Sequence, residues 1–111
     1  MHSPEPGRTP DLRAILAANP FVAAPLDCYS DWPWRTVCRE QGAGLCFSEM
    51  IPAIALVHEG RDAMRRVRVR PDDHPIAIQV EGSDPALVAE AAARAEAEGA
   101  DFVDVNAGCP S

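Results

Sequence analysis

Four short apolar segments recur along the chain, separated by longer stretches of mixed polarity. They cover residues 21–24, 45–48, 76–80 and 102–105, and each is an almost continuous hydrophobic run. Runs of this kind are typical of strands buried on both faces, because a strand with one solvated face alternates apolar and polar residues. The sequence therefore predicts four buried strands.

Helices are expected between these strands. The intervening stretches have apolar residues at helical spacing, with capping residues before two of them and glycines after these two. The expected helices run from a cap at Ser30 or Asp31 to Gly42, over residues 52–66, and from a cap at Ser83 or Asp84 to Gly99. Gly60 interrupts the middle helix and weakens its pattern.

Strict alternation of strands and helices predicts an α/β fold with a parallel sheet. An open doubly wound sheet and half of a (β/α)8 barrel both satisfy this order. Residues 25–30, after the first strand, lack the glycine-rich turn of a dinucleotide-binding sheet, which favours the barrel. We expect residues 1–19 to form a mobile tail leading into a helical turn or a short strand, and residues 20–111 to form the N-terminal half of a TIM barrel, truncated after its fourth strand.

The composition indicates which residue types build the core, in which compartment the protein is expected, and whether a metal site is expected. The chain has 111 residues, of which 47% are hydrophobic and only 5% aromatic, so the core must be built mainly from Ala, Val, Leu and Ile. Neither a membrane-spanning run nor a secretory signal is evident, so we expect a cytoplasmic protein. The four cysteines have no metal-binding spacing, and we expect no metal.

The charge is unevenly distributed. The net charge of -7 argues against a wholly basic nucleic-acid-binding surface. Every basic residue is nevertheless an arginine, and half of the ten lie within residues 61–70. Such a cluster is typical either of a solvated helix face or of a surface that contacts phosphate.

Polar side chains collect where the predicted strands end. In a parallel α/β protein, ligands bind at the carboxyl ends of the strands. The residues at those ends are Pro25, Leu26, Asp27, Cys28, Ser48, Glu49, Gln79, Glu81, Asn106 and Cys109. The amides of Gln79 and Asn106 offer both donors and acceptors, which suits a planar heterocycle such as a flavin or a pyrimidine. Cys109 has the chemistry of a nucleophile or a proton donor, whereas Cys28, Cys38 and Cys46 are interpreted as structural.

Several pieces of this sequence, in the same order along the chain, resemble the tRNA-dihydrouridine synthases, which are flavoenzymes that reduce uridines of tRNA. The pieces are residues 24–26 with 30–35, 42–44 with 48–50, 77–80 with 82–85, and finally 104–110, which includes Asn106-Ala107-Gly108-Cys109-Pro110. The resemblance extends from about Phe21 to Ser111. It implies an FMN-binding (β/α)8 barrel that is followed by a helical domain.

The resemblance also implies roles for particular residues. Pro25, Leu26 and Asp27 would lie against FMN, Gln79 would hydrogen-bond its ring, and Asn106 would shape the pocket for flavin and substrate. Cys109 would be the general acid that protonates C5 of a flipped-out uracil while hydride reaches C6. NADPH would be the reductant, and tRNA the partner.

Several positions depart from the family pattern. Leu26 stands where Met is usual, and Glu81 stands where the family has an apolar or aromatic residue. Cys28 stands where Gly is usual, which predicts a strained or rearranged loop if the backbone there needs a positive φ. The family's later Lys, His, phosphate-binding region and helical domain are absent, so we expect a fragment that is inactive alone. A related flavin barrel acting on a free pyrimidine, and a non-catalytic half-barrel that pairs with a second chain, are the alternatives.

Overall fold

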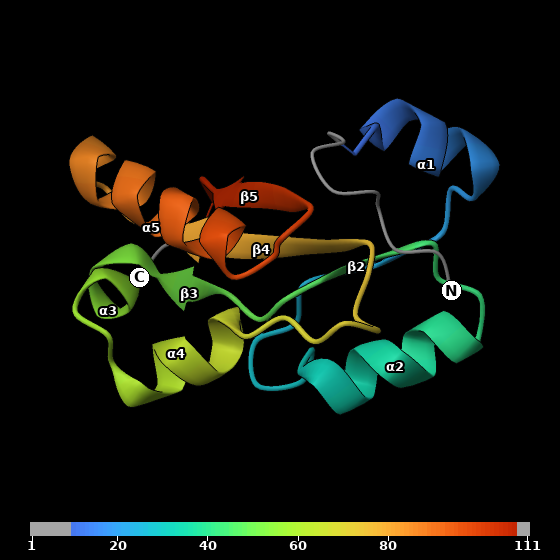
Figure 1. The fold of residues 1–111 in the computed structure, drawn as a ribbon, viewed down its shortest axis with the longest axis horizontal. Coiled ribbons are helices and arrows are strands. Elements are labelled where there is room, and N and C mark those ends of the chain that lie inside the picture. The colour runs from blue at the N-terminus through green and yellow to red at the C-terminus, as the bar shows by residue number, and fades with distance from the viewer. Residues whose placement is uncertain (1–9, 109–111) are drawn as a thin grey trace.

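A parallel sheet forms the centre of the fold in the computed structural model, which describes residues 10–108 (Figure 1). Its strands are β1 (Val22–Ala23), β2 (Leu45–Phe47), β3 (Ile51–Pro52), β4 (Ile76–Glu81) and β5 (Phe102–Asn106). The helices are α1 (Leu12–Ala18), α2 (Trp32–Glu40), α3 (Ala53–Val57), α4 (Arg61–Val67) and α5 (Pro85–Ala97). No helix in the described part of the chain is long and apolar enough to cross a membrane.

Neighbouring strands follow the order of the chain. β1 pairs with β2, β2 with β4, and β4 with β5, all in parallel register. A doubly wound sheet reverses its strand order at a switch point, whereas a barrel continues in one direction. The predicted α/β class, with parallel units like those of a partial TIM barrel, is confirmed.

β3 is a short strand that the hydrophobic pattern did not predict. It pairs with the same edge of β4 as β2 does, because β5 occupies the other edge. From Phe47 to Ile51 the chain advances four residues, while the paired positions on β4, Ala77 to Val80, advance three. β2 and β3 are therefore one strand with a single extra residue, which is the definition of a β-bulge.

The helix expected over residues 52–66 is wrong as a continuous element. It divides into α3, which ends at Val57 with His58 as its C-cap, and α4, which begins after Gly60. Glu59 adopts a φ of 58°, a left-handed conformation that no helix can continue through. Upstream, residues 12–18 form the complete helix α1, capped by the carboxylate of Asp11, where the sequence predicted only a helical turn or a short strand.

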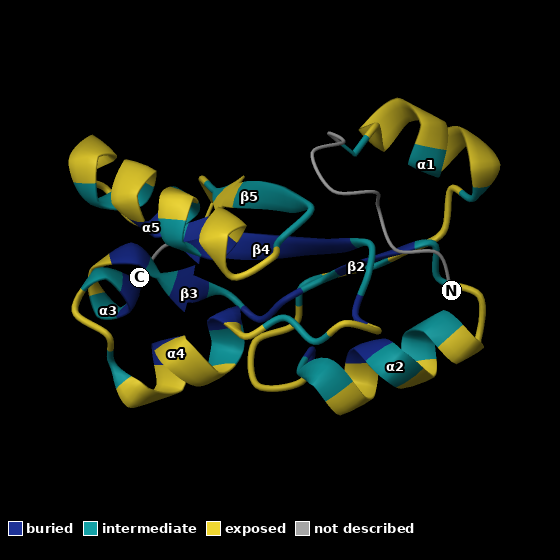
Figure 2. Ribbon diagram, in the orientation of Figure 1, coloured by how far each residue is buried: buried dark blue, intermediate teal, exposed yellow. Residues whose placement is uncertain are grey.

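The core lies between one face of β4 and the helices. Ile76, Ile78 and Val80 alternate along β4 and point to this side, where they meet helical residues that include Leu56 and Ala91. Figure 2 shows β4 buried along nearly its whole length. The side chains in this cluster are Ala, Val, Leu and Ile, as the composition predicted.

A buried ionic cluster joins α2 to the loop before β4. Asp73 is fully buried, and its carboxylate accepts hydrogen bonds from the guanidinium groups of Arg35 and Arg39, with 2.6 Å between Arg35 Nη2 and Asp73 Oδ2. The same two guanidiniums also donate to the carbonyls of Ser30 and Pro75, at 2.7 and 2.8 Å. The Asp73 carboxylate thus positions two arginine side chains, one of which also bonds the loop before α2 and the other the loop before β4.

Replacement of Asp73 tests this cluster. Asp73→Asn leaves the buried charge of Arg35 without a counter-ion, so we expect the free energy of unfolding to fall by about 3–5 kcal/mol. Urea denaturation measures this loss. Asp72→Asn is the matched control, because the Asp72 side chain is exposed and its loss should change stability by no more than about 0.5 kcal/mol. Equal stabilities of the two variants would contradict a role for Asp73 in holding the fold.

Candidate functional site

The face of the sheet opposite the core becomes polar toward the carboxyl ends of the strands. Alternation along β4 places Ala77 and Gln79 on this inner face, since Ile76, Ile78 and Val80 face the helices. On β5, Asp104 is the register partner of Gln79, and Asn106 that of Glu81. Polar groups from two neighbouring strands thus meet at the end of the sheet where parallel α/β proteins bind ligands.

Gln79 is at the centre of a side-chain network on this face. Its side-chain Nε2 donates to Asp104 Oδ2 at 2.7 Å, and its Oε1 lies 3.5 Å from Asn106 Nδ2. Its backbone N–H donates to Ser48 Oγ at 3.0 Å. The structure therefore brings together Gln79 and Asn106, the two amides that the sequence identified, and adds Asp104, which it did not.

The loop after β1 is held by Ser30. The hydroxyl of this fully buried serine accepts a hydrogen bond from Leu26 N and donates one to Leu26 O, both at 2.9 Å. The backbone N–H groups of Tyr29 and Ser30 donate to the same carbonyl. Leu26 is held in place through its backbone, while its side chain stays 43% exposed and available for contact.

Two consecutive residues of this loop differ sharply in how they are accommodated. Asp27 is tied to α4, because Arg66 Nη1 donates to its Oδ1 at 2.5 Å. The sequence predicted that Cys28, which replaces a glycine, would make this loop either strained or rearranged. Its φ of 68° shows that the backbone keeps the left-handed conformation, so the loop is strained. Cys28 is also exposed, which corrects its interpretation as a structural residue.

Met50 connects the β1 loop with the amide network. Its carbonyl accepts from Arg66 Nη1 at 2.7 Å, and its Sδ lies 3.5 Å from Asn106 Nδ2. Since Arg66 also holds Asp27, a continuous series of contacts runs from the β1 loop to β5. Pro25, Leu26 and Asp27 are therefore in the same region as Gln79 and Asn106, and Cys109 lies outside the described residues.

Glu49 is the buried acidic residue of this end of the sheet. Its side chain is 3% exposed, and Arg65 Nη2 and Arg66 Nε lie 3.1 and 3.4 Å from its Oε2. The same arginines contact Asp62, and the hydrogen bond from Arg65 lowers the pKa of the Asp62 carboxyl. The buried negative charge of Glu49 is thus compensated by α4, one turn of which carries both cations.

The remaining thiols of the described chain are not arranged for metal binding. Cys46 is fully buried, and desolvation raises the pKa of its thiol, while Cys38 is half-buried. Within residues 10–108 no three His, Cys, Asp or Glu side chains are grouped so as to hold a metal ion.

Comparison with known proteins places the chain in a family. The fold is that of a parallel α/β protein with polar residues at the ends of its strands, and a family model described as dihydrouridine synthase matches residues 22–111. The chain belongs to the dihydrouridine synthase family.

Individual relatives agree with this assignment. Over 93 residues the chain is 38% identical to tRNA-dihydrouridine synthase B of Pseudomonas aeruginosa, and over 94 residues it is 42% identical to the protein of the same name from Salmonella typhimurium. It is 36% identical to a probable tRNA-dihydrouridine synthase of Rickettsia bellii over 97 residues. These alignments cover 84–86% of this chain but only 28–29% of each relative.

Substitution of Cys28 tests whether the loop is strained. Cys28→Gly removes the side chain from a left-handed backbone position, so we expect the free energy of unfolding to rise by about 1 kcal/mol. Cys28→Ala is the matched control, because it removes the thiol but keeps the Cβ atom that disfavours this conformation. Thermal or urea unfolding measures both variants, and a gain with Ala equal to that with Gly would show that the thiol and not the backbone is responsible.

Proposed function

We propose that the natural protein carrying this chain reduces uridine to 5,6-dihydrouridine in tRNA. The observation that carries the proposal is the pair of amides, Gln79 and Asn106, joined at 3.5 Å on the inner face of a parallel sheet. This pair lies in a chain that belongs to the dihydrouridine synthase family, and two of its relatives are named tRNA-dihydrouridine synthase B.

The residues present fit FMN as the cofactor. The amide groups of Gln79 and Asn106 can match the alternating N–H and C=O groups of an isoalloxazine ring, and the half-exposed Leu26 side chain offers an apolar contact. Pro25 and Asp27 flank that leucine in the loop that Ser30 fixes. Bound FMN, recharged by NADPH, would supply the hydride that C6 of the uracil ring accepts.

Cys109 is the proposed general acid, which gives its proton to C5 of the same ring. A proton donor must be within reach of the ring and carry its proton, so the role does not require a thiolate of lowered pKa. Asn106 Oδ1 accepts the backbone N–H of Gly108, the residue before Cys109 in the sequence, at 2.9 Å. Asn106 therefore has a second proposed role, which is to orient the backbone that leads to the thiol.

The activity is proposed for a closed barrel in the cytoplasm. Within the described residues, β1 and β5 are the two outer strands of the main ladder, and each pairs along one edge. Such edges invite pairing with further strands or with other chains, and barrel closure removes them. We accordingly expect the 111 residues expressed alone to be inactive.

Replacement of Cys109 tests the proposed reaction. In the full-length natural protein, Cys109→Ala should reduce the rate of dihydrouridine formation by at least about 100-fold, because the general acid is lost. Dihydrouridine is measured after reaction with unmodified tRNA, and 5,6-dihydrouracil is measured after a parallel reaction with free uracil. Unchanged turnover of tRNA by the variant would refute the role of Cys109, and reduction of free uracil in preference to tRNA by the unmodified protein would refute the proposed substrate.

Replacement of Gln79 tests cofactor binding independently of turnover. Gln79→Leu keeps the approximate size of the side chain but removes its donors and acceptors, so we expect FMN affinity to fall about tenfold. Flavin fluorescence titration of the full-length protein measures the dissociation constant. Gln41→Leu is the control, since Gln41 is exposed beyond the end of α2. Equal FMN affinities for the two variants would remove Gln79 from the flavin site.

A further inference from the structure

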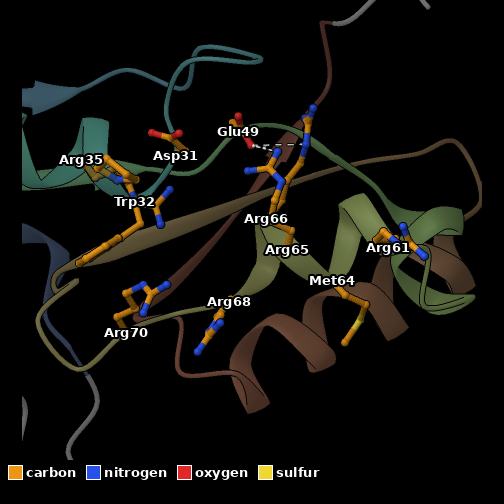
Figure 3. Close-up of a pocket in the computed structure, with 11 residues that line it drawn as sticks. Asp31, Trp32, Arg35, Glu49, Arg61, Met64, Arg65, Arg66, Arg68 and Arg70 are labelled. Carbon is orange, nitrogen blue, oxygen red and sulfur yellow. Dashed lines mark hydrogen bonds and ion pairs between the residues drawn. The ribbon is translucent and has the colours of Figure 1, made fainter.

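A pocket lined mainly by residues of α2, of α4 and of the segment after α4 gathers most of the arginines of the chain. It has a volume of about 660 Å³ and lies between the start of α2 and the region of α4 (Figure 3). The basic residues that line it are Arg35, Arg61, Arg65, Arg66, Arg68 and Arg70, whereas Asp31 and Glu49 are its acidic lining residues. The local charge is thus opposite to the net charge of -7 of the chain.

Half of these arginines are already neutralised within the protein. Arg35 pairs with Asp73, and Arg65 and Arg66 share Glu49 and Asp62. Their charges contribute to folding and to the position of the β1 loop. They offer little uncompensated charge to a ligand.

The other three arginines have no carboxylate partner among the described residues. Arg61 and Arg68 are exposed, at the first position of α4 and directly after its last. Arg70 is held by a cation–π contact, with its guanidinium carbon 4.1 Å from the centre of the Trp32 ring. This contact uses the face of the guanidinium and leaves its N–H donors available for acceptor oxygens.

The spacing of these three cations suits an extended polyanion better than one small anion. Seven residues of helical rise separate Arg61 from Arg68, which corresponds to about 10 Å. Figure 3 shows Arg70 beside Trp32 and Arg68 next to Arg70, with Arg61 on the other side of the pocket. A single phosphate would require guanidiniums that converge on one point, whereas successive phosphates of a nucleic acid strand lie at intervals along a line.

We infer that this surface, defined by Arg61, Arg68 and Arg70, binds the phosphodiester backbone of the RNA substrate. The inference rests on the proposed function for the identity of the RNA. Arg66 lines the same pocket and also holds Asp27 of the β1 loop, so the pocket that carries this surface extends to the candidate flavin site. An RNA whose uridine enters the inner face would therefore pass its backbone over these arginines.

Binding of unmodified tRNA to the full-length protein tests the inference. The double variant R61Q/R68Q removes two exposed cations that make no ion pair within residues 10–108, so it should keep the thermal stability and FMN affinity of the parent. We expect about tenfold weaker tRNA binding at 0.1 M salt. The slope of log affinity against log salt concentration should become less steep by about 2, because roughly one unit is lost for each phosphate contact. Fluorescence anisotropy at several salt concentrations measures both.

Arg13→Gln is the matched control, since Arg13 is another exposed arginine, on α1, and makes no ion pair within the described residues. Steady-state kinetics add a second readout, in which R61Q/R68Q should raise the KM for tRNA and leave kcat unchanged. Affinity and salt slope equal to those of the Arg13 variant would overturn the inference. The inference would also be overturned if R61Q/R68Q lost binding of an acidic protein partner and kept the tRNA affinity of the parent.

The outcomes for the inference and for the proposed function are separable. If the unmodified protein reduces uridine and R61Q/R68Q binds tRNA normally, the function stands and the RNA surface is refuted. If the variant loses affinity and salt dependence but the unmodified protein never forms dihydrouridine, the RNA surface stands and the proposed reaction is refuted.

Discussion

The fold depends on β4 being paired along both edges and covered on both faces. Backbone hydrogen bonding to β2 and β3 on one side and to β5 on the other leaves its side chains only two directions. Residues with even numbers, such as Ile78, supply the core, while Gln79 faces the candidate site. Core residues and candidate site residues therefore alternate along β4 and lie on opposite faces of the same strand. A shift of register by one residue would exchange them.

Much of this arrangement could be predicted from the sequence because it is local. Continuous apolar runs identified the main strands, and the carboxyl-end rule placed Gln79 and Asn106 in one region. Asp104 was within reach of the same reasoning, since it is two residues from Asn106 on the same strand and therefore on the same face. The strain at Cys28 was likewise predictable, given the glycine expected there, and its φ of 68° agrees with that expectation.

Other features depend on contacts between residues far apart in the chain. Arg66 reaches Asp27 across 39 positions, and no pattern in either segment indicates the partner. The division between α3 and α4 depends on the left-handed conformation of Glu59, a residue type that does not favour it. Gly60 indicated an interruption of the helix but not its division into two. β3 is only two residues long and contains a proline, which makes it too short for any periodicity. Contacts between residues so far apart in the chain are found only in the three-dimensional structure.

The single extra residue between β2 and β3 has a consequence for how the protein can change. Within a regular strand, neighbouring side chains must point to opposite faces, but the bulge releases Ser48, Glu49 and Met50 from that rule. Each serves a different neighbour: Ser48 supports the backbone of Gln79, Glu49 meets the cations of α4, and Met50 touches Asn106. Three elements, β4, α4 and β5, are thus joined through one short segment, so a deletion there would disrupt all three contacts at once, whereas a substitution would alter only one of them.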